Sequence, residues 1–306
     1  MAQPSPIPLL FLVLVLVLAF PPPASPGDTL VLGYVSAKAR KQIPRLLPMA
    51  DYAAAGLAEL GVSAAGVRLA RDLEEMGELL RAGRVDWLVE TPAGAARLMG
   101  EAGALPLLVW GKKGAWSYRT LIVARRDGPV ARLADLRGRR IAFEDPGSTS
   151  GFYLPLMELE AAGLSAVPLA EPRAEAPRDA VGYAFAGSER NVVTWVLAEL
   201  AAAGALSDGD WEDPDRVQPE QRAALRVIHR SAPVPRALVV AAAHLDPRRR
   251  ARLAEHLAGA AADPAAAPAL AAFFRSAGFR PLAEDERRWL GELERRWRTL
   301  GETVVR

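Results

Sequence analysis

The chain has 306 residues, of which 51% are hydrophobic, so it is long enough to form two lobes with buried cores. Its 38 basic side chains nearly balance its 36 acidic ones, so the charge does not indicate a nucleic-acid-binding protein. The absence of cysteine excludes disulfides, thiolate metal sites, cysteine nucleophiles and a lipid-modified N-terminal cysteine. The three histidines are not paired at metal-ligand spacing, so we expect neither a metal nor a cofactor.

The N-terminus carries a short apolar segment. Residues 9–20 form an unbroken apolar run, shorter than the roughly 20 residues that a membrane-spanning helix needs. Three prolines at residues 21–23 end the run, and small residues follow at Ala24 and Ser25, although no Lys or Arg precedes the run. We expect residues 1–25 to be a signal peptide and the protein to be exported to the periplasm. An uncleaved N-terminal membrane anchor is the alternative.

Short apolar runs then alternate with stretches of helical periodicity. We predict strands at residues 29–35, 67–70, 85–90 and 105–110, and helices at residues 43–60, 73–80 and 91–100. Such alternation indicates parallel strands joined by helices, and ligands of such sheets bind beyond the carboxyl ends of the strands. Glu90 and Thr91 follow a predicted strand, as Ser36 and Asp72 do, and are candidate ligand-facing residues. Residues of these types more often serve only as turn or cap residues.

The same alternation continues to about residue 241, and the rest of the chain is predicted to be helical. Strands are predicted at residues 118–124, 141–143, 181–186, 203–206, 225–229 and 237–241, and helices at residues 133–138, 151–162, 191–202, 247–262, 264–277 and 285–300. The segments near residues 118–120 and 231–236 are predicted to be crossings between two lobes. Trp289 and Trp297 lie on a predicted helix and are expected to pack against the protein.

Residues 139–152 combine a strand, a turn and a helix start. The turn at residues 145–147 contains Pro and Gly, and three hydroxyl residues follow it, namely Ser148, Thr149 and Ser150. The first amides of a helix have no internal partner and lie at the positive end of the helix dipole. A helix cap needs one hydroxyl, whereas this segment offers three. The segment therefore predicts a set of donors suited to a small oxyanion.

The same segment lacks the signatures of nucleotide-binding loops and of hydrolases. No lysine follows Gly151 as the G-x-x-x-x-G-K-[ST] loop requires, so we expect a small anion instead of a triphosphate. Ser150 is not in a G-x-S-x-G motif, and no acid/base pair or activated nucleophile accompanies it. We therefore do not expect an enzyme. An enzyme that acts on phosphorylated substrates is the remaining alternative of this class.

Several motifs resemble the periplasmic phosphate/phosphite/phosphonate-binding proteins of ABC transporters. The principal motif is Leu133-x-Asp135-Leu136-x-Gly138-x-x-Ile141-Ala142-Phe143-x-Asp145-Pro146-x-Ser148-Thr149-Ser150-Gly151. Supporting motifs follow in the expected order: Gly187-Ser188-x-x-Asn191, Ser207-x-x-Asp210-Trp211 and Val227-Ile228-x-x-Ser231-x-Pro233-x-Pro235. The resemblance extends over about residues 30–279.

The resemblance implies an α/β fold of the type II periplasmic-binding-protein class. Each of two lobes would contain a mostly parallel sheet flanked by helices, and two hinge crossings would join the lobes over a ligand. Lobe 1 would comprise residues 29–119 and 234–306, and lobe 2 residues 120–233.

The resemblance also assigns roles to individual residues. Ser148, Thr149 and Ser150 match residues that bind phosphonate oxygens, and Tyr118 matches the tyrosine commonly found at the first crossing. The chain departs from the family at three places: Ser188 replaces a usual histidine, Glu90-Thr91-Pro92-Ala93 replaces an aromatic or asparagine–tyrosine pair, and Ala237 lies near the place of an amine-binding aspartate. An aminoalkylphosphonate is therefore expected only if Glu90 or Asp208 binds its ammonium group.

The resemblance implies a solute-binding component of an ABC transporter that captures phosphate, phosphite or phosphonate between its lobes. Its partner would be the transporter permease, it would not bind nucleic acid, and it would be a monomer. The alternative is a periplasmic sensor or adaptor of the same fold that signals to a membrane receptor. The predicted ligand-binding residues are Ser148, Thr149, Ser150, Tyr118, Ser188, Glu90, Thr91 and Asp208.

Overall fold

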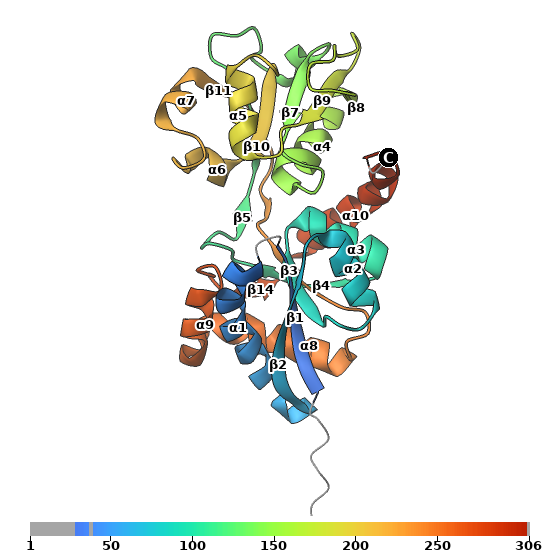
Figure 1. Ribbon diagram of the computed structural model, residues 1–306, viewed down its shortest axis with the longest axis vertical. Coiled ribbons are helices and arrows are strands. Elements are labelled where there is room, and N and C mark those ends of the chain that lie inside the picture. The colour runs from blue at the N-terminus through green and yellow to red at the C-terminus, as the bar shows by residue number, and fades with distance from the viewer. Residues whose placement is uncertain (1–27, 37–38, 305–306) are drawn as a thin grey trace, which may run out of the picture.

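The computed structural model describes residues 28–36 and 39–304, which form two lobes, each with a six-stranded sheet flanked by helices (Figure 1). The two lobes and their mixed α/β construction confirm the predicted fold class. The predicted signal peptide lies outside the described residues. None of the helices in the described part of the chain combines the length and the hydrophobicity that a membrane span requires.

The sheet of the first lobe has the strand order β14-β4-β13-β3-β1-β2. Its strands are β1 (Asp28–Val35), β2 (Val62–Ala70), β3 (Trp87–Glu90), β4 (Leu105–Trp110), β13 (Leu238–Ala241) and β14 (Phe279–Pro281). Strand β1 pairs in parallel with β2 and β3, whereas β13 runs antiparallel to both β3 and β4. The chain therefore returns from the second lobe into the middle of the first sheet.

Two layers of helices cover this sheet because its buried side chains alternate between its faces. Trp87 and Val89 pack with helices α1 (Ala39–Ala55), α8 (Pro247–Gly259) and α9 (Ala267–Ala272). Leu88 faces the opposite way and packs with α2 (Leu73–Arg81), α3 (Pro92–Ala102) and α10 (Glu284–Val304). The short helices η1 (Ala58–Leu60), η4 (Ala260–Ala262) and η5 (Pro264–Ala266) complete this lobe.

The sheet of the second lobe has the strand order β11-β6-β10-β7-β9-β8. Its strands are β6 (Thr120–Arg125), β7 (Arg140–Phe143), β8 (Ala166–Pro168), β9 (Val181–Phe185), β10 (Ala203–Ser207) and β11 (Leu225–Arg230). Strand β7 is parallel to β9 and β10, and β6 is antiparallel to β10 and β11. Its helices are η2 (Leu133–Leu136), η3 (Thr149–Tyr153), α4 (Leu154–Ala161), α5 (Glu189–Leu197), α6 (Asp208–Glu212) and α7 (Pro219–Ala224).

The two crossings between the lobes lie side by side. Strand β5 (Ser117–Tyr118) pairs antiparallel with β12 (Val234–Pro235), and the hydroxyl of Ser231 accepts a hydrogen bond from the N–H of Thr120 at 3.0 Å. The strand predicted at residues 118–124 is therefore divided at Arg119, where the chain enters the second sheet. The predicted boundaries between the lobes, after residue 119 and after residue 233, fall in this region. The division of the chain at these residues stays a prediction.

Helix α10 extends from the first lobe toward the second (Figure 1). The side chain of Arg296 forms an ion pair with Glu160 of α4 in the second lobe. The ring of Trp297 lies 6.0 Å from the ring of Tyr153, and Trp289 packs against Tyr118 and Leu154. Both tryptophans thus pack against the protein, as predicted, and α10 is a third contact between the lobes.

Candidate functional site

The helices that follow β3 and β7 begin opposite each other, at the carboxyl ends of strands from different lobes. The N–H of Ala93, in the first turn of α3, donates a hydrogen bond to the hydroxyl of Thr149 at the start of η3, at 2.9 Å. Thr149 is only 2% exposed, so this bond is buried between the lobes. Two positive helix ends therefore meet at one point.

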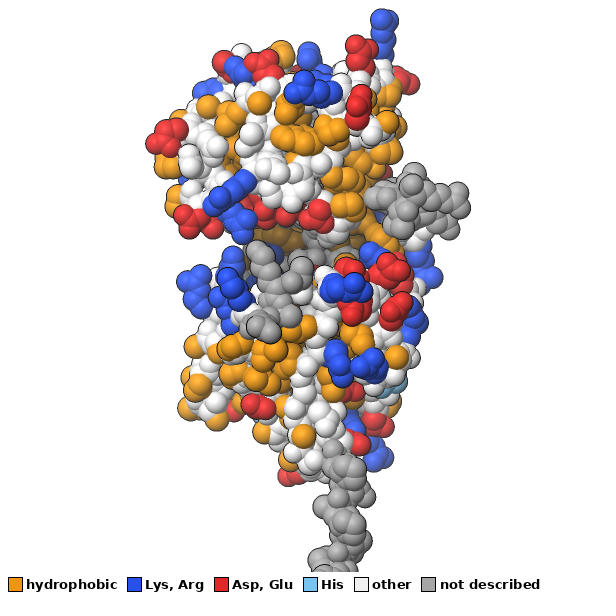
Figure 2. Space-filling model, in the orientation of Figure 1, with side chains coloured by type: hydrophobic (Ala, Val, Ile, Leu, Met, Phe, Trp, Pro, Cys, Tyr) orange, Lys and Arg blue, Asp and Glu red, His pale blue; other side chains and the backbone are white. Residues whose placement is uncertain are grey.

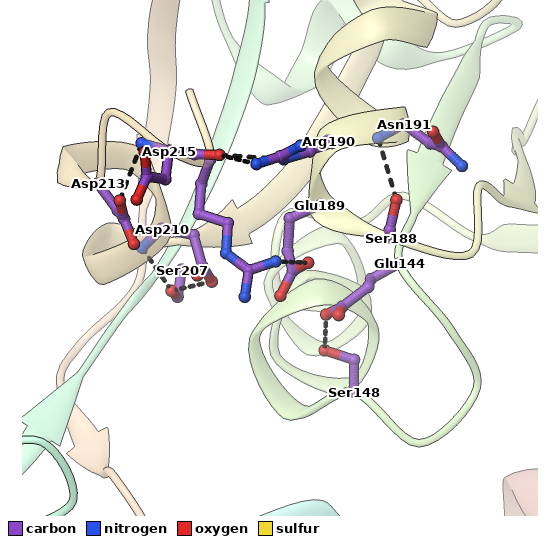
Figure 3. Close-up of polar contacts among 11 residues, drawn as sticks. Glu144, Ser148, Ser188, Glu189, Arg190, Asn191, Ser207, Asp210, Asp213 and Asp215 are labelled. Carbon is purple, nitrogen blue, oxygen red and sulfur yellow. Dashed lines mark hydrogen bonds and ion pairs between the residues drawn. The ribbon is translucent and has the colours of Figure 1, made fainter. Parts of the chain in front are cut away.

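Ser148 holds the start of η3 in place. Its hydroxyl accepts from the N–H of Gly151 at 2.9 Å and donates to the carboxylate of Glu144 at 2.7 Å (Figure 3). A Cβ at Gly151 would lie 2.6 Å from that of Glu144, so this close approach requires a glycine. The hydroxyl proton of Ser148 is thus already donated within its own lobe.

Ser150 differs from Ser148 in its hydrogen bonding. Its carbonyl accepts from the hydroxyl of Thr120 at 2.6 Å, which fixes the backbone, and the residue is 8% exposed. Its own hydroxyl has no hydrogen-bond partner among the described residues. A nearly buried hydroxyl at a helix start is therefore available to a ligand oxygen.

Tyr118 lies at the first crossing and is 5% exposed. The guanidinium of Arg236 lies over its ring, 4.5 Å from the ring centroid. Burial raises the pKa of the phenol to about 12, although Arg236 and the Thr149 side chain oppose the rise. The phenol is therefore protonated at neutral pH and can donate a hydrogen bond.

Glu90 and Thr91 form the junction between β3 and α3. The carboxylate of Glu90 accepts from the N–H of Thr91 at 2.6 Å, and its side chain lies over the first turn of α3. A Cβ at Gly94 would come within 2.4 Å of the Glu90 side chain. Burial raises the pKa of Glu90, and Thr91 and Lys112 oppose this rise. Thr91 occupies the N-cap position of α3, but its side chain does not cap the helix.

Ser188 and Asp208 make mainly local contacts. The hydroxyl of Ser188 accepts from the N–H of Asn191 at 3.3 Å and points toward its own helix (Figure 3). The carboxylate of Asp208 accepts from the N–H groups of Gly209, at 2.9 Å, and Arg119, at 3.2 Å. The helix end that faces Ser148–Ser150 from across the lobes is that of α3, a pairing that the sequence did not reveal. Contact of Ser188 and Asp208 with a ligand stays a prediction.

Four carboxyl groups at the same end of the second sheet were not among the predicted ligand-binding residues, although Asp145 and Asp210 belong to the motifs that resemble the family. Glu144, Asp145, Glu189 and Asp210 follow the carboxyl ends of β7, β9 and β10. Burial, followed by the charge of Glu189, raises the pKa of Glu144 to about 8, and burial also raises the pKa values of Asp145 and Asp210. Arg216 partly balances them through a contact of 3.2 Å with Glu189 (Figure 3). Their positions directly after predicted strands were the available signal.

Two cationic side chains on the side of the first lobe were also missed. Lys112 follows β4, and Arg236 follows β12. Burial lowers the pKa of Lys112 to about 8. Burial thus moves the pKa values of the acid Glu144 and the base Lys112 toward each other. Figure 2 shows acidic side chains along the lower edge of the second lobe and basic ones facing them at the left of the first lobe.

Two cavities need to be distinguished. A small cavity of about 60 Å³ lies between the lobes and is lined by Leu73, Ala93, Gly94, Arg97, Pro146, Gly147, Tyr153 and Trp297. A larger one of about 820 Å³ lies in the second lobe, beside Gly138 and Ala202, at the amino ends of β7 and β10. Only the small cavity adjoins Ala93 and the turn before Ser148. We therefore place the candidate site between the lobes, because the hydroxyl and N–H donors lie there, although the cavity there is the smaller of the two.

The described residues contain no group of three or more His, Asp or Glu side chains arranged to hold a metal ion. The chemistry of the site instead consists of neutral donors: hydroxyl groups, a phenol and helix N–H groups. The two cations and the carboxyl groups surround these donors. Hydroxyl groups and helix N–H groups are donors of the kind that suit an oxyanion.

The chain matches a family and several solved structures. A family described as "ABC transporter, phosphonate, periplasmic substrate-binding protein" matches residues 32–286. XAC2383 from Xanthomonas citri, solved with ATP, is 37% identical, with 91% of this chain and 100% of that chain covered and a TM-score of 0.81. The same protein was solved with a chloride ion, at 37% identity, 90% and 99% coverage and a TM-score of 0.81.

A more distant structure shares the fold alone. PhnD1 from Prochlorococcus marinus, solved with methylphosphonate, is 14% identical, with 88% of this chain and 98% of that chain covered and a TM-score of 0.60. The family match covers most of the chain, including both helix starts of the site. The chain therefore belongs to the phosphonate-binding family of periplasmic substrate-binding proteins of ABC transporters.

Proposed function

We propose that the protein captures a phosphate, phosphite or phosphonate group between its lobes and delivers it to an ABC transporter permease. The observation that carries this proposal is the buried hydrogen bond from the N–H of Ala93 to the hydroxyl of Thr149. It brings the positive ends of α3 and η3, from different lobes, to one point. Both ends would attract the same small anion.

Separation of the lobes breaks this bond and frees both groups. The N–H of Ala93 and the hydroxyl of Thr149 can then donate to ligand oxygens, together with the hydroxyl of Ser150 and the phenol of Tyr118. Hydrogen bonds to a charged ligand contribute about 1.5–3 kcal/mol each. Near the upper end of that range, four such bonds, less the cost of ordering the ligand and the lobes, reach the roughly 8 kcal/mol of a micromolar site.

The placement of the donors also couples binding to closure. Ala93 belongs to the first lobe, and Thr149 and Ser150 belong to the second. A ligand that contacts both sets binds the closed form more tightly than the open form, so it shifts the population toward closure. The permease would then recognise the outer faces of the closed lobes. Glu90 and Asp208 are the proposed partners of a ligand ammonium group, if the ligand has one.

A second candidate ligand is a nucleotide. The observation that favours it is the relative XAC2383, which was solved with ATP and is 37% identical over 91% of this chain. The chain lacks the phosphate-binding loop of nucleotide-hydrolysing enzymes, but a binding protein needs only donors for the terminal phosphate. Such a ligand would place its terminal phosphate against the same donors.

Isothermal titration calorimetry with phosphate, phosphite, methylphosphonate, 2-aminoethylphosphonate and ATP tests both candidates. We expect at least one phosphorus oxyanion to bind with a Kd in the micromolar range. Binding of ATP alone would favour the nucleotide, and failure of all five would contradict the proposal. Transport of the bound ligand in vesicles that contain the permease separates a transport role from the sensor or adaptor alternative.

A further inference from the structure

Two cationic side chains lie beside the proposed site, and backbone hydrogen bonds fix the segments that carry them. Lys112 begins a tight turn in which it forms a β-bridge with Ala115. The N–H of Arg236 donates to the carbonyl of Trp116 at 3.0 Å, directly after the β5–β12 ladder. Both residues therefore lie at the connections between the lobes, where hinge motion displaces them least.

Neither side chain has an ion-pair partner among the described residues. No carboxylate there lies within 4.0 Å of the ammonium of Lys112 or the guanidinium of Arg236. Each cation instead lies over an aromatic ring: Lys112 is 5.5 Å from the ring centroid of Trp110, and Arg236 is 4.5 Å from that of Tyr118.

The two carboxylates whose charges act on Lys112, those of Glu90 and Asp210, are engaged elsewhere. The carboxylate of Glu90 accepts from the N–H of Thr91 at 2.6 Å, and that of Asp210 accepts from the hydroxyl of Ser207 at 2.5 Å. Lys112 and Arg236 also repel each other, and Lys113 adds to the repulsion on Lys112. A partly buried cation without an ion-pair partner is unfavourable, so the two side chains can accept an anionic partner that no described residue supplies.

We propose that Lys112 and Arg236 recognise ligand charge and make the site selective for a dianionic oxyanion, such as a phosphonate or phosphate, over a monoanionic one, such as a sulfonate. This inference rests on the proposed function. The hydroxyl groups of Thr149 and Ser150 and the N–H of Ala93 are neutral donors, which serve any tetrahedral oxyanion equally. The two cations add an attraction that increases with ligand charge.

The carboxyl groups of the second lobe strengthen the argument. Glu144, Asp145, Glu189 and Asp210 lie on the other side of the site, and those of them that are ionised oppose the approach of an anion from that direction. The cations of the first lobe must offset this repulsion, and they must do so more strongly for a dianion. Without these two cations, the repulsion from the carboxyl groups would make the site favour a monoanion over a dianion.

The experiment compares two ligands of the same shape and different charge. Methylphosphonate at a pH of about 7.5 exists partly as a dianion while Lys112 stays mainly protonated, whereas methanesulfonate is a monoanion. We expect the wild-type protein to bind methylphosphonate more tightly by about tenfold or more. Wild-type binding of neither ligand, with phosphate, phosphite, 2-aminoethylphosphonate and ATP also failing to bind, would overturn the proposed function itself, whereas equal binding of methylphosphonate and methanesulfonate would overturn only the charge selectivity.

The variants Lys112→Met and Arg236→Gln identify the source of the preference. Each should bring the two affinities toward equality, mainly through about tenfold weaker methylphosphonate binding, because each removes one cation. Lys113→Met is the matched control, since Lys113 is adjacent but exposed, and it should keep the wild-type ratio. Arg236→Lys, which keeps the charge, should keep most of the preference.

A preference that survives in both Lys112→Met and Arg236→Gln would overturn the inference, as would an equal loss in Lys113→Met. Circular dichroism and thermal unfolding of each variant ensure that affinities are compared between folded proteins. If Arg236→Gln fails to fold, Lys112→Met alone decides, because Lys112 contributes no hydrogen bond from its side chain within the described residues.

Discussion

The hydroxyl of Ser148, the N-cap residue of η3, donates to the carboxylate of Glu144 at 2.7 Å. Burial and the charge of Glu189 raise the pKa of Glu144 to about 8 from the ordinary value of 4.5. A carboxyl group of raised pKa contributes stability that is fully present below the unfolded pKa. That contribution is lost as pH rises through the folded pKa. The N-cap residue of η3 is therefore hydrogen-bonded to a carboxyl group whose pKa is raised to about 8.

We predict that Glu144→Gln stabilises the protein at pH 8 and not at pH 4.5. Glutamine keeps the hydrogen-bonding shape and removes the negative charge, so the free energy of unfolding at pH 8 should increase by about 1–3 kcal/mol. Urea unfolding at the two pH values measures the difference. Glu175→Gln is the control, because Glu175 is exposed and has no ion pair among the described residues. Equal changes in the free energy of unfolding at both pH values would contradict the raised pKa of Glu144.

Thr149→Val should weaken binding of whichever anion the wild type binds by at least about tenfold, because it removes a charge-assisted hydrogen bond. Valine has nearly the shape of threonine, so packing at this buried position is kept. The variant also leaves the N–H of Ala93 without an acceptor in the closed form. Calorimetry measures the affinity, and Thr194→Val, on the exposed side of α5, serves as the control. An unchanged affinity would remove Thr149 from the site.

Ser150→Ala and Ser148→Ala should have different effects although the residues are only two positions apart. The hydroxyl of Ser150 has no partner among the described residues, so its loss should weaken ligand binding by about tenfold with little effect on stability. The hydroxyl of Ser148 caps η3, so its loss should lower the free energy of unfolding by about 0.5–2 kcal/mol. Paired calorimetry and urea unfolding test both. If only Ser148→Ala weakened ligand binding, Ser148 and not Ser150 would be the residue that contacts the ligand.

The helices and strands of the first lobe could be predicted where local signals mark their ends. Asp72 caps α2 by accepting from the N–H of Glu75, as its position before the helix indicated. The predicted helix at residues 43–60 ends earlier, at Ala55, where the chain turns through η1. Strands β8 and β14 have only three residues each and are defined by their partners, so periodicity could not reveal them.

The site was predictable to the extent that its chemistry is local. The hydroxyl residues 148–150 lie at a helix start, which their sequence and the family resemblance both indicated. Their partner Ala93 is 56 residues away and contributes only backbone, so its side chain carries no signal. Lys112 and Arg236 resemble ordinary surface cations in the sequence. That neither has an ion-pair partner among residues 28–36 and 39–304 becomes visible only when the surrounding carboxylates have been placed in space.

Arg296→Gln should increase the open fraction of the protein without a large loss of stability. The ion pair between Arg296 and Glu160 joins α10 to the second lobe, and it must break when the lobes separate. A single partly exposed ion pair contributes about 0–1 kcal/mol to folding, so urea unfolding should change little. The same free energy lost from the closed form alone can shift the ratio of open to closed molecules by up to about fivefold. Distances between spin labels on the two lobes measure that ratio.

Arg298→Gln is the matched control, because Arg298 pairs with Glu294 within α10 and not with the second lobe. A shift of equal size in the ratio of open to closed molecules of that variant would show that the Arg296–Glu160 ion pair does not stabilise the closed form.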